Sequence, residues 1–295
     1  MGGGRAGRGG GVEPIVLDPR GGAAGADVTD GSLTFIGTAT VLLRLPGFTI
    51  LTDPNFLHRG ESAYLGLGLR SRRRTDPAMQ IGDLPDLDAV VLSHHHGDHF
   101  DRVAAAELDK DLPIITEPGS AGALRRQGFR RAVALETWQE QRLVRGDDEL
   151  RVTSAPGKHA PDPLGHLLPS VMGSVLDLVR AGRHVLRLYI TGDTLLHDRL
   201  AEIPQRCPDI DLCLIHLGGT RVAGILLTMD GAQGVQALQV VRPRAAVPIH
   251  YDDYTVFKSP LSDFRSAVAG ASLDTEVRYV DRGDTLTFAL DHTGG

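Results

Sequence analysis

DAVVLSHHHGDHFD, residues 88–101, is the stretch of sequence that decides the fold. Its first half is a short apolar run of the kind that forms buried strands. Four side chains that commonly bind metal ions follow at once, in the pattern His-x-His-x-Asp-His: His94, His96, Asp98 and His99. On a loop that leaves a strand end, His94 and His96 can converge on one cation. Asp98 and His99 can then face a second cation.

The chemistry of these side chains favours a transition metal. Imidazole and carboxylate together suit Zn²⁺ and, less exclusively, Mn²⁺ or Fe²⁺. The alternative is a polar turn whose histidines are merely exposed. Four ligand types directly behind a hydrophobic strand argue against that alternative.

The motif resembles the signature of the metallo-β-lactamase superfamily. The resemblance implies an α/β fold, an αββα sandwich of the metallo-β-lactamase type, with a site for two divalent metal ions. Four further residues match the remaining family motifs in chain order: Asp53 in ILTDP, His159 in SAPGKH, Asp193 in YITGDT and His250 in VPIHYDD. Each follows a predicted strand, where open α/β folds place their sites.

The resemblance also implies which residues hold each metal ion. One metal would take three histidines: His94, His96 and His159. The other would take Asp98, His99 and His250, with Asp193 shared between the two metals. Asp53 would steady the ligand loop by hydrogen bonds without touching a metal. His95 should point away from its neighbours, so we interpret it as a loop residue.

Within the superfamily, three segments are most similar to the branch that contains ascorbate-6-phosphate lactonase-like proteins and N-acylphosphatidylethanolamine phospholipase D. They are FIGTATVLLRLPGFTILTDPNF (35–56), LSHHHGDHFD (92–101) and PRAAVPIHYDDY (243–254). One departure is Thr38, where relatives often carry histidine. The branch has mixed functions, so the resemblance indicates the fold and the metal better than the substrate.

The implied function is that of a metal-dependent hydrolase. A metal-bound hydroxide would attack a phosphodiester or a lactone or ester bond of a small molecule or lipid, with both bond types left open. Asp98 or Asp193 would act catalytically by relaying a proton to the leaving group. The alternative is a non-catalytic or redox metal-binding member of the same fold.

Strands and helices are interleaved along the chain, which favours a layered α/β domain. We expect a flexible Gly-rich arm over residues 1–27, although PIVLDP within it could pair as an edge strand, and a single domain over residues 28–295. Residues 174–194 predict a hairpin turning at Ala181-Gly182. Residues 276–290 predict a closing hairpin with its turn at residues 282–284.

Composition limits the other functional classes. The net charge of −6 argues against a nucleic-acid partner, because phosphate-binding proteins usually carry a basic surplus. Two cysteines do not make a disulfide framework, and no apolar run reaches the length of a transmembrane segment. We therefore expect a cytoplasmic protein whose partner is a small-molecule or lipid-like substrate.

Two further hypotheses concern the rim of the site. Residues 160–172, including Leu167 and Leu168, and part of 55–70 are predicted to line the substrate mouth with an apolar wall. Tyr251 or Tyr254 could donate to a developing oxyanion, or both rings could simply pack. The remaining histidines are interpreted as surface or hydrogen-bonded residues: His58, His166, His184, His197, His216 and His292.

Overall fold

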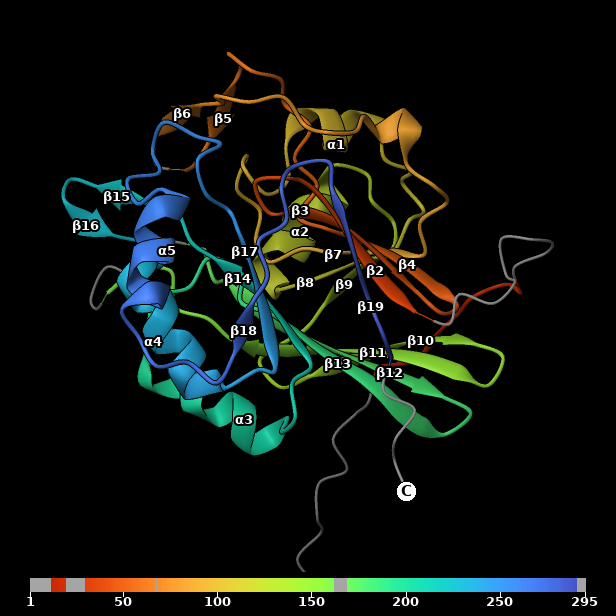
Figure 1. Cartoon of the computed structure of the whole chain (residues 1–295). Helices are drawn as coiled ribbons and strands as arrows, with labels where there is room; N and C mark the ends of the chain where they lie inside the picture. The colour runs from red at the N-terminus through yellow and green to blue at the C-terminus, as the bar shows by residue number, and fades with distance from the viewer. Residues whose placement is uncertain (1–11, 20–29, 67, 162–168, 291–295) are drawn as a thin grey trace, which may run out of the picture.

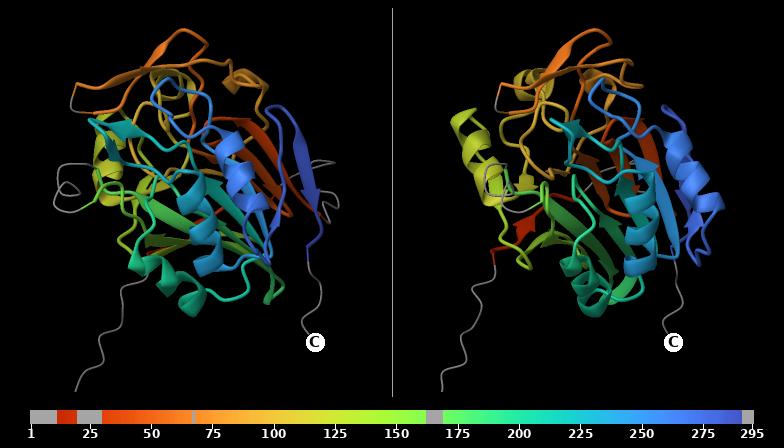
Figure 2. Two further views of the ribbon diagram at one scale, coloured as in Figure 1. Left: turned by 60° about the vertical axis from the view of Figure 1, so that its left-hand side comes forward. Right: turned by 90° about the vertical axis from the view of Figure 1, so that its left-hand side faces the viewer.

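Two large stacked sheets form the centre of the molecule (Figures 1 and 2). The computed structural model describes residues 12–19, 30–66, 68–161 and 169–290. The eight-stranded sheet has the order β1 (Ile15–Val16), β10 (Glu140–Arg145), β11 (Asp148–Pro156), β12 (Met172–Arg180), β13 (Arg183–Ile190), β14 (Leu212–His216), β17 (Ala245–Ile249) and β18 (Glu276–Val277). The seven-stranded sheet has the order β19 (Thr285–Phe288), β2 (Gly31–Gly37), β3 (Thr40–Leu45), β4 (Phe48–Thr52), β7 (Ala89–Val91), β8 (Ile114–Thr116) and β9 (Ala132–Ala134).

Helices cover the outer face of each sheet. On the eight-stranded sheet, Figure 1 shows three helices along one flank: α3 (Glu202–Arg206), α4 (Gly231–Val241) and α5 (Leu261–Ala269). Side chains of these helices share an apolar core with β13, β14 and β17. On the seven-stranded sheet, α1 (Arg102–Glu107) and α2 (Pro118–Arg126) pack over β4, β7 and β8. A third core lies between the sheets, so the predicted αββα sandwich is confirmed.

Local sequence explains most of these elements. The turn between β3 and β4 falls at Pro46-Gly47, where Gly47 has φ +79°. The hairpin predicted over residues 174–194 is present as β12 and β13, which pair antiparallel from Ser174–Ile190 to Arg180–Arg183. Helix α4 begins at Asp230, whose carboxylate accepts a hydrogen bond from the Gln233 amide at 3.0 Å, and ends before Pro243.

The closing hairpin expected over residues 276–290 is wrong. A turn exists at its centre, where the Asp284 amide donates to the Asp281 carbonyl at 3.0 Å. Its two arms, however, join different sheets: β18 pairs in parallel with β17, and β19 pairs antiparallel with β2. Each arm thus extends the open edge of an existing sheet, which gives it a partner already fixed in place.

Part of the stretch expected to be a flexible arm is described by the structure. Residues Ile15–Val16 pair in parallel with Leu143–Val144 at the edge of the eight-stranded sheet. Val12, Ile15 and Leu17 pack against the core between the sheets. The PIVLDP segment therefore contributes an edge strand, because its apolar side chains reach that core.

Two short hairpins project from one end of the sandwich. They are β5 (Ser62–Tyr64) with β6 (Arg70–Arg72), and β15 (Arg221–Val222) with β16 (Ile225–Leu226). Short 3₁₀ helices occur at Ile81–Asp83 and Asp198–Ala201. Across the described ranges, no helix combines the length and the apolar character that crossing a bilayer requires.

Candidate metal centre

The predicted site residues lie at one edge of both sheets. Strands β4 and β7 run in parallel in one sheet, and β13, β14 and β17 run in parallel in the other. The carboxyl ends of parallel strands meet at the same edge, so residues that follow these strands are brought together. Asp53 follows β4, His94 follows β7, and His250 follows β17.

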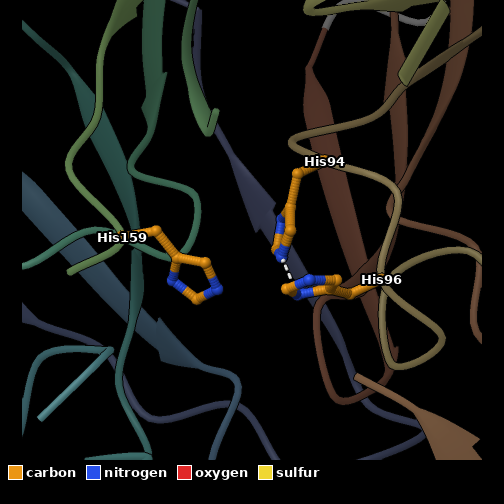
Figure 3. A group of neighbouring side chains, drawn as sticks. All are labelled: His94, His96 and His159. Carbon is orange, nitrogen blue, oxygen red and sulfur yellow. Dashed lines mark hydrogen bonds between the residues drawn. The ribbon is translucent and has the colours of Figure 1, made fainter. Parts of the chain in front are cut away.

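The first cluster consists of three histidines from two loops. His94, His96 and His159 offer ring nitrogens that all lie within 4.8 Å of one another. His94 Nε2 lies 2.9 Å from His96 Nδ1. Figure 3 shows the ring of His159 facing the other two across a small gap. Three convergent, buried imidazoles with no carboxylate among them are a donor set that suits Zn²⁺.

The second cluster adds carboxylates to histidines. Asp98, His99, Asp193 and His250 also offer ligand atoms within 4.8 Å of one another, and all four side chains are buried. His99 Nε2 lies 3.2 Å from Asp193 Oδ2, and His250 Nε2 lies 3.7 Å from Asp98 Oδ2. The seven residues predicted as ligands thus fall into the two groups of the sequence analysis.

The Nδ1 atoms of three histidines in the clusters have acceptors in the protein. His159 Nδ1 lies 3.1 Å from the Leu227 carbonyl, and His250 Nδ1 lies 3.2 Å from the Leu217 carbonyl. His99 Nδ1 lies 3.0 Å from Asp53 Oδ2. Such contacts fix the tautomer, so that Nε2 of each ring carries a lone pair toward the cluster.

Several inward-facing atoms have no hydrogen-bond partner among the described residues. They are His96 Nε2, Asp98 Oδ1, His99 Nε2, Asp193 Oδ1 and His250 Nε2. Leaving one such buried group unpaired costs about 1–3 kcal/mol, so a concentration of them in one place needs an explanation. All five atoms belong to residues of the two clusters, so the residues present fit divalent metal ions.

Electrostatics keeps the first cluster neutral and Asp193 ionised, whereas in the second cluster burial lowers the pKa of His99 and of His250 less than the neighbouring carboxylates raise it. Burial and the neighbouring His99 hold the pKa of His94 well below its usual value, and burial lowers the pKa of His96 to about 4. Burial opposes ionisation of Asp193, but His250 and His99 still hold its pKa well below the usual range. Neutral imidazoles and ionised carboxylates are the ligand forms.

A cavity of about 290 Å³ opens over both clusters. Its floor includes His96, Asp98, His159 and Asp193. Leu65 and Leu69 of the β5–β6 hairpin lie on its wall, as predicted for part of residues 55–70. Residues 162–168, which include Leu167 and Leu168 of the predicted lid, lie outside the described residues.

A family model described as a beta-lactamase superfamily domain matches residues 49–251, which is more than half of the chain. The chain belongs to the beta-lactamase superfamily. The matched segment begins just before Asp53 and ends just after His250, so it contains every residue of both clusters.

Relatives in the superfamily are similar over most of the chain. A UPF0173 metal-dependent hydrolase from Anaeromyxobacter sp. strain K is 26% identical over 262 residues, covering 87% of this chain and 86% of the relative. N-acyl-phosphatidylethanolamine-hydrolyzing phospholipase D 1 from Caenorhabditis elegans is 26% identical over 233 residues, covering 75% of this chain and 64% of its own. The crystal structure of isothiocyanate hydrolase from Delia radicum gut bacteria has a TM-score of 0.73 at 23% identity, covering 88% and 99% of the two chains. That likeness shows a shared fold.

His216 is a site residue that the sequence analysis missed. It ends β14, where it pairs with Ile249, the residue before His250, and it is fully buried. Its Nε2 lies 3.4 Å from Asp53 Oδ2, and its ring stacks on His99 at 6.1 Å between centroids. It therefore lies beneath the second cluster and supports Asp53. Its position at the end of a predicted strand was the one signal in the sequence that could have marked it as a site residue.

Asn55 connects the metal-binding loop to the rest of the fold. Its Nδ2 donates to the Gly97 carbonyl at 2.9 Å, between the two halves of the motif. Its Oδ1 accepts hydrogen bonds from the buried guanidinium of Arg73 and, at 3.0 Å, from the Tyr254 hydroxyl. The Tyr254 hydroxyl is thus already engaged and fully buried. The hypothesis that it donates to an oxyanion is not supported.

Tyr251 also packs rather than facing the metal clusters. Its ring lies 6.0 Å from that of Phe35 in the core between the sheets. Burial raises the pKa of its hydroxyl to about 12. Among the described residues that line the cavity, neither Tyr251 nor Tyr254 appears. The packing alternative is therefore favoured for both rings.

Backbone strain is concentrated at the same edge. Thr38, Asp53 and His250 have φ values of +54°, +35° and +60°, which side chains with a Cβ rarely adopt. The Thr38 carbonyl accepts a 2.6 Å hydrogen bond from the His250 amide. Thr38, the departure from the family pattern, thus holds the backbone of His250. Strained residues of this kind cluster at functional sites and persist because their surroundings hold them.

Asp53→Asn is expected to weaken metal binding about 10–100-fold while leaving the fold intact. Asp53 accepts hydrogen bonds from the Ser93 amide at 2.6 Å and from His99 Nδ1, and its pKa is lowered to about 2 because His99 and His216 outweigh its burial. The amide oxygen of asparagine can replace one acceptor of the Asp53 carboxylate, but the substitution removes the negative charge. Competition with a fluorescent zinc chelator measures the affinity, and an unchanged value would contradict the role given to Asp53.

Proposed function

We propose that this chain is a metal-dependent hydrolase that binds two divalent metal ions, with Zn²⁺ as the first choice and Mn²⁺ or Fe²⁺ as alternatives. His94, His96 and His159 hold one ion. Asp98, His99 and His250 hold the other, and Asp193 is shared. The observation that carries the proposal is the pair of buried donor clusters, whose inward-facing atoms have no hydrogen-bond partner among the described residues.

The residues of the site have separate tasks in hydrolysis. Bound divalent ions supply Lewis acidity and lower the pKa of water, so that hydroxide is available near neutral pH. Asp98 Oδ1 has no hydrogen-bond partner among the residues that the structure describes, and Asp98 lines the cavity floor, so this carboxylate can carry a proton to the leaving group. Asp193 is the second candidate for that step. No serine or cysteine nucleophile is needed.

The bond that is broken belongs to one of two classes. A phosphodiester offers anionic oxygens to the metals, and a lactone or other carboxylic ester offers a carbonyl oxygen on which negative charge develops. The chain is 26% identical to an N-acyl-phosphatidylethanolamine-hydrolyzing phospholipase D, which supports a phosphodiester as one candidate. The substrate is in either case a small molecule or a lipid that reaches the cavity over the clusters.

The alternative is a redox or non-catalytic member of the same superfamily. A diiron redox protein would normally have a carboxylate in the first cluster, which here consists of three histidines. A non-catalytic member would be expected to have lost ligands, whereas both clusters retain every predicted residue. Both observations favour the hydrolase.

Metal analysis combined with a substrate screen tests the proposal. We expect about two ions per chain by inductively coupled plasma mass spectrometry after zinc reconstitution. Hydrolysis of at least one member of a panel of phosphodiesters, lactones, esters, thioesters and isothiocyanates should appear with the metal and vanish after chelation. Protein that binds no transition metal after reconstitution would refute the proposal. Metal-loaded protein that is inactive on every class would favour the non-catalytic alternative.

A further inference from the structure

The wall of the cavity over the metal clusters is apolar on two sides. Leu65 and Leu69 come from the loop of the β5–β6 hairpin, and Val222 and Leu227 come from the β15–β16 hairpin. Figure 1 shows both hairpins at the same end of the molecule. Segments more than 150 residues apart thus enclose the same space. At about 290 Å³, the space is at the lower end of the range of about 300–1,000 Å³ usual for small-molecule sites.

Glycine keeps the space above the first cluster open. Gly66 has φ +83°, and a Cβ built there would lie 3.4 Å from His96 Nε2. Any other side chain at this position would be strained by the positive φ, and its Cβ would occupy the space next to His96. The loop therefore approaches the cluster closely while leaving room for a ligand between Leu65 and Leu69.

Positive charge is missing from this wall. No lysine or arginine lines the cavity among the residues that the structure describes. Arg70 instead lies over the Tyr64 ring, 5.7 Å from its centroid, and lines a different cavity. Arg221 reaches Asp230, with 3.6 Å between Nη2 and Oδ2.

Two other basic residues near the clusters are absent from the described lining of the cavity. They are Lys158 and Arg73, which is buried and donates to Asn55. A phosphodiester carries a full negative charge that proteins normally meet with arginine or lysine. Apart from metal ions, the described part of this cavity offers such a charge two histidines, two aspartates, Thr220 and an apolar wall.

We infer that this cavity takes a neutral substrate with a short apolar group, a carboxylic ester or lactone, in preference to a phosphodiester. The inference rests on the proposed hydrolase function and narrows it. The reacting carbonyl would lie over Asp98 and Asp193, and the apolar group would contact Leu65, Leu69, Val222 and Leu227.

The binding of two series of probes of increasing chain length tests the inference without requiring turnover. Acetyl, butanoyl and hexanoyl hydroxamates, which are neutral metal-binding probes, are titrated into zinc-loaded protein by calorimetry. Alkylphosphonates of the same chain lengths serve as the anionic series. We expect hydroxamate affinity to rise up to about fourfold for each added methylene until the cavity is filled. Equal affinity along the series, or tighter binding of the phosphonate at each length, would overturn the inference.

A pair of valine-to-lysine variants tests the wall directly. Val222→Lys should lower kcat/KM for p-nitrophenyl butyrate about tenfold, because an apolar contact is lost, and should raise it for bis(p-nitrophenyl) phosphate. Val16→Lys is the matched control, since Val16 is 75% exposed on the edge strand β1, and should change neither value. A Val222→Lys variant that behaves like the control would overturn the inference.

The outcomes separate this inference from the proposed function. Metal-loaded protein that prefers the phosphodiester would refute the neutral substrate and leave the hydrolase standing. Hydroxamate affinity that rises with chain length in a protein that hydrolyses nothing would support the apolar cavity and refute the hydrolase.

Discussion

Asp193→Ala is expected to weaken metal binding at both clusters and to lower kcat/KM strongly. Asp193 Oδ2 lies 3.2 Å from His99 Nε2, and its Oδ1 lies 3.4 Å from His250 Nδ1, so it faces the second cluster directly. Its charge also raises the pKa of His94 and His159 against the larger lowering effect of burial, which places it near the first cluster as well. Asp98, the other carboxylate of the two clusters, also raises the pKa of His96 and of His159 against the larger lowering effect of burial.

The expected loss is large because both ions depend on the same side chain. Metal content should fall from about two ions per chain to about one or fewer. Metals supply several kcal/mol of transition-state stabilisation, which corresponds to a loss of roughly 10³-fold in kcat/KM. Mass spectrometry of the metal and steady-state kinetics measure the two effects, and circular dichroism checks the fold.

Asp147→Ala is the matched control for this variant. Asp147 is exposed in the turn between β10 and β11, at the start of β11, whereas His159 of the first cluster follows the end of β11. The same substitution there should leave metal content and kcat/KM unchanged. An Asp193→Ala protein that retains both ions would show that Asp193 does not bridge them.

The clustering of His94, His96, Asp98 and His99 could be predicted because the four residues lie within one loop. Their spacing and the apolar strand before them are local properties of the sequence. Asp53, His159, Asp193 and His250 were different. Each alone is an ordinary residue after a strand, and only the family resemblance predicted that they belong to one site. Their convergence depends on how parallel strands are ordered in two sheets, which local pattern does not contain.

Features that depend on tertiary contacts escaped the sequence analysis. His216 has no motif of its own, and its role arises because β14 lies beside β17. Asn55 carries no signal either, since its amide acts through a loop 42 residues further along the chain. The closing hairpin was predicted wrongly because two short strands around a turn are compatible with pairing to each other or to separate sheet edges.

One close backbone contact of the loop that carries His94, His96, Asp98 and His99 is also not visible in the sequence. The Gly97 amide donates to the Tyr64 carbonyl at 2.8 Å, so the loop lies directly against strand β5. A Cβ built on Gly97 would lie 2.7 Å from the Tyr64 nitrogen and 2.8 Å from its oxygen. Both are backbone atoms, so no side-chain rotation can relieve the overlap. Glycine is required here by close approach, between the ligands His96 and Asp98.

Gly97→Ala is therefore expected to displace the loop or the β5–β6 hairpin. Overpacking of this kind costs about 1–3 kcal/mol of stability, which a chain of this size should survive. A displacement near 1 Å at the site should lower kcat by about 10²-fold, and metal affinity should fall with it.

Gly122→Ala is the matched control. Gly122 lies within α2, where an added Cβ meets only Arg126 Nη1 at 3.7 Å. This substitution should stabilise the protein by about 0.5–1 kcal/mol. Thermal unfolding, metal affinity and kcat are measured for both variants. Wild-type kcat and metal affinity in Gly97→Ala would show that the loop does not need its contact with β5 to hold His96 and Asp98 in place.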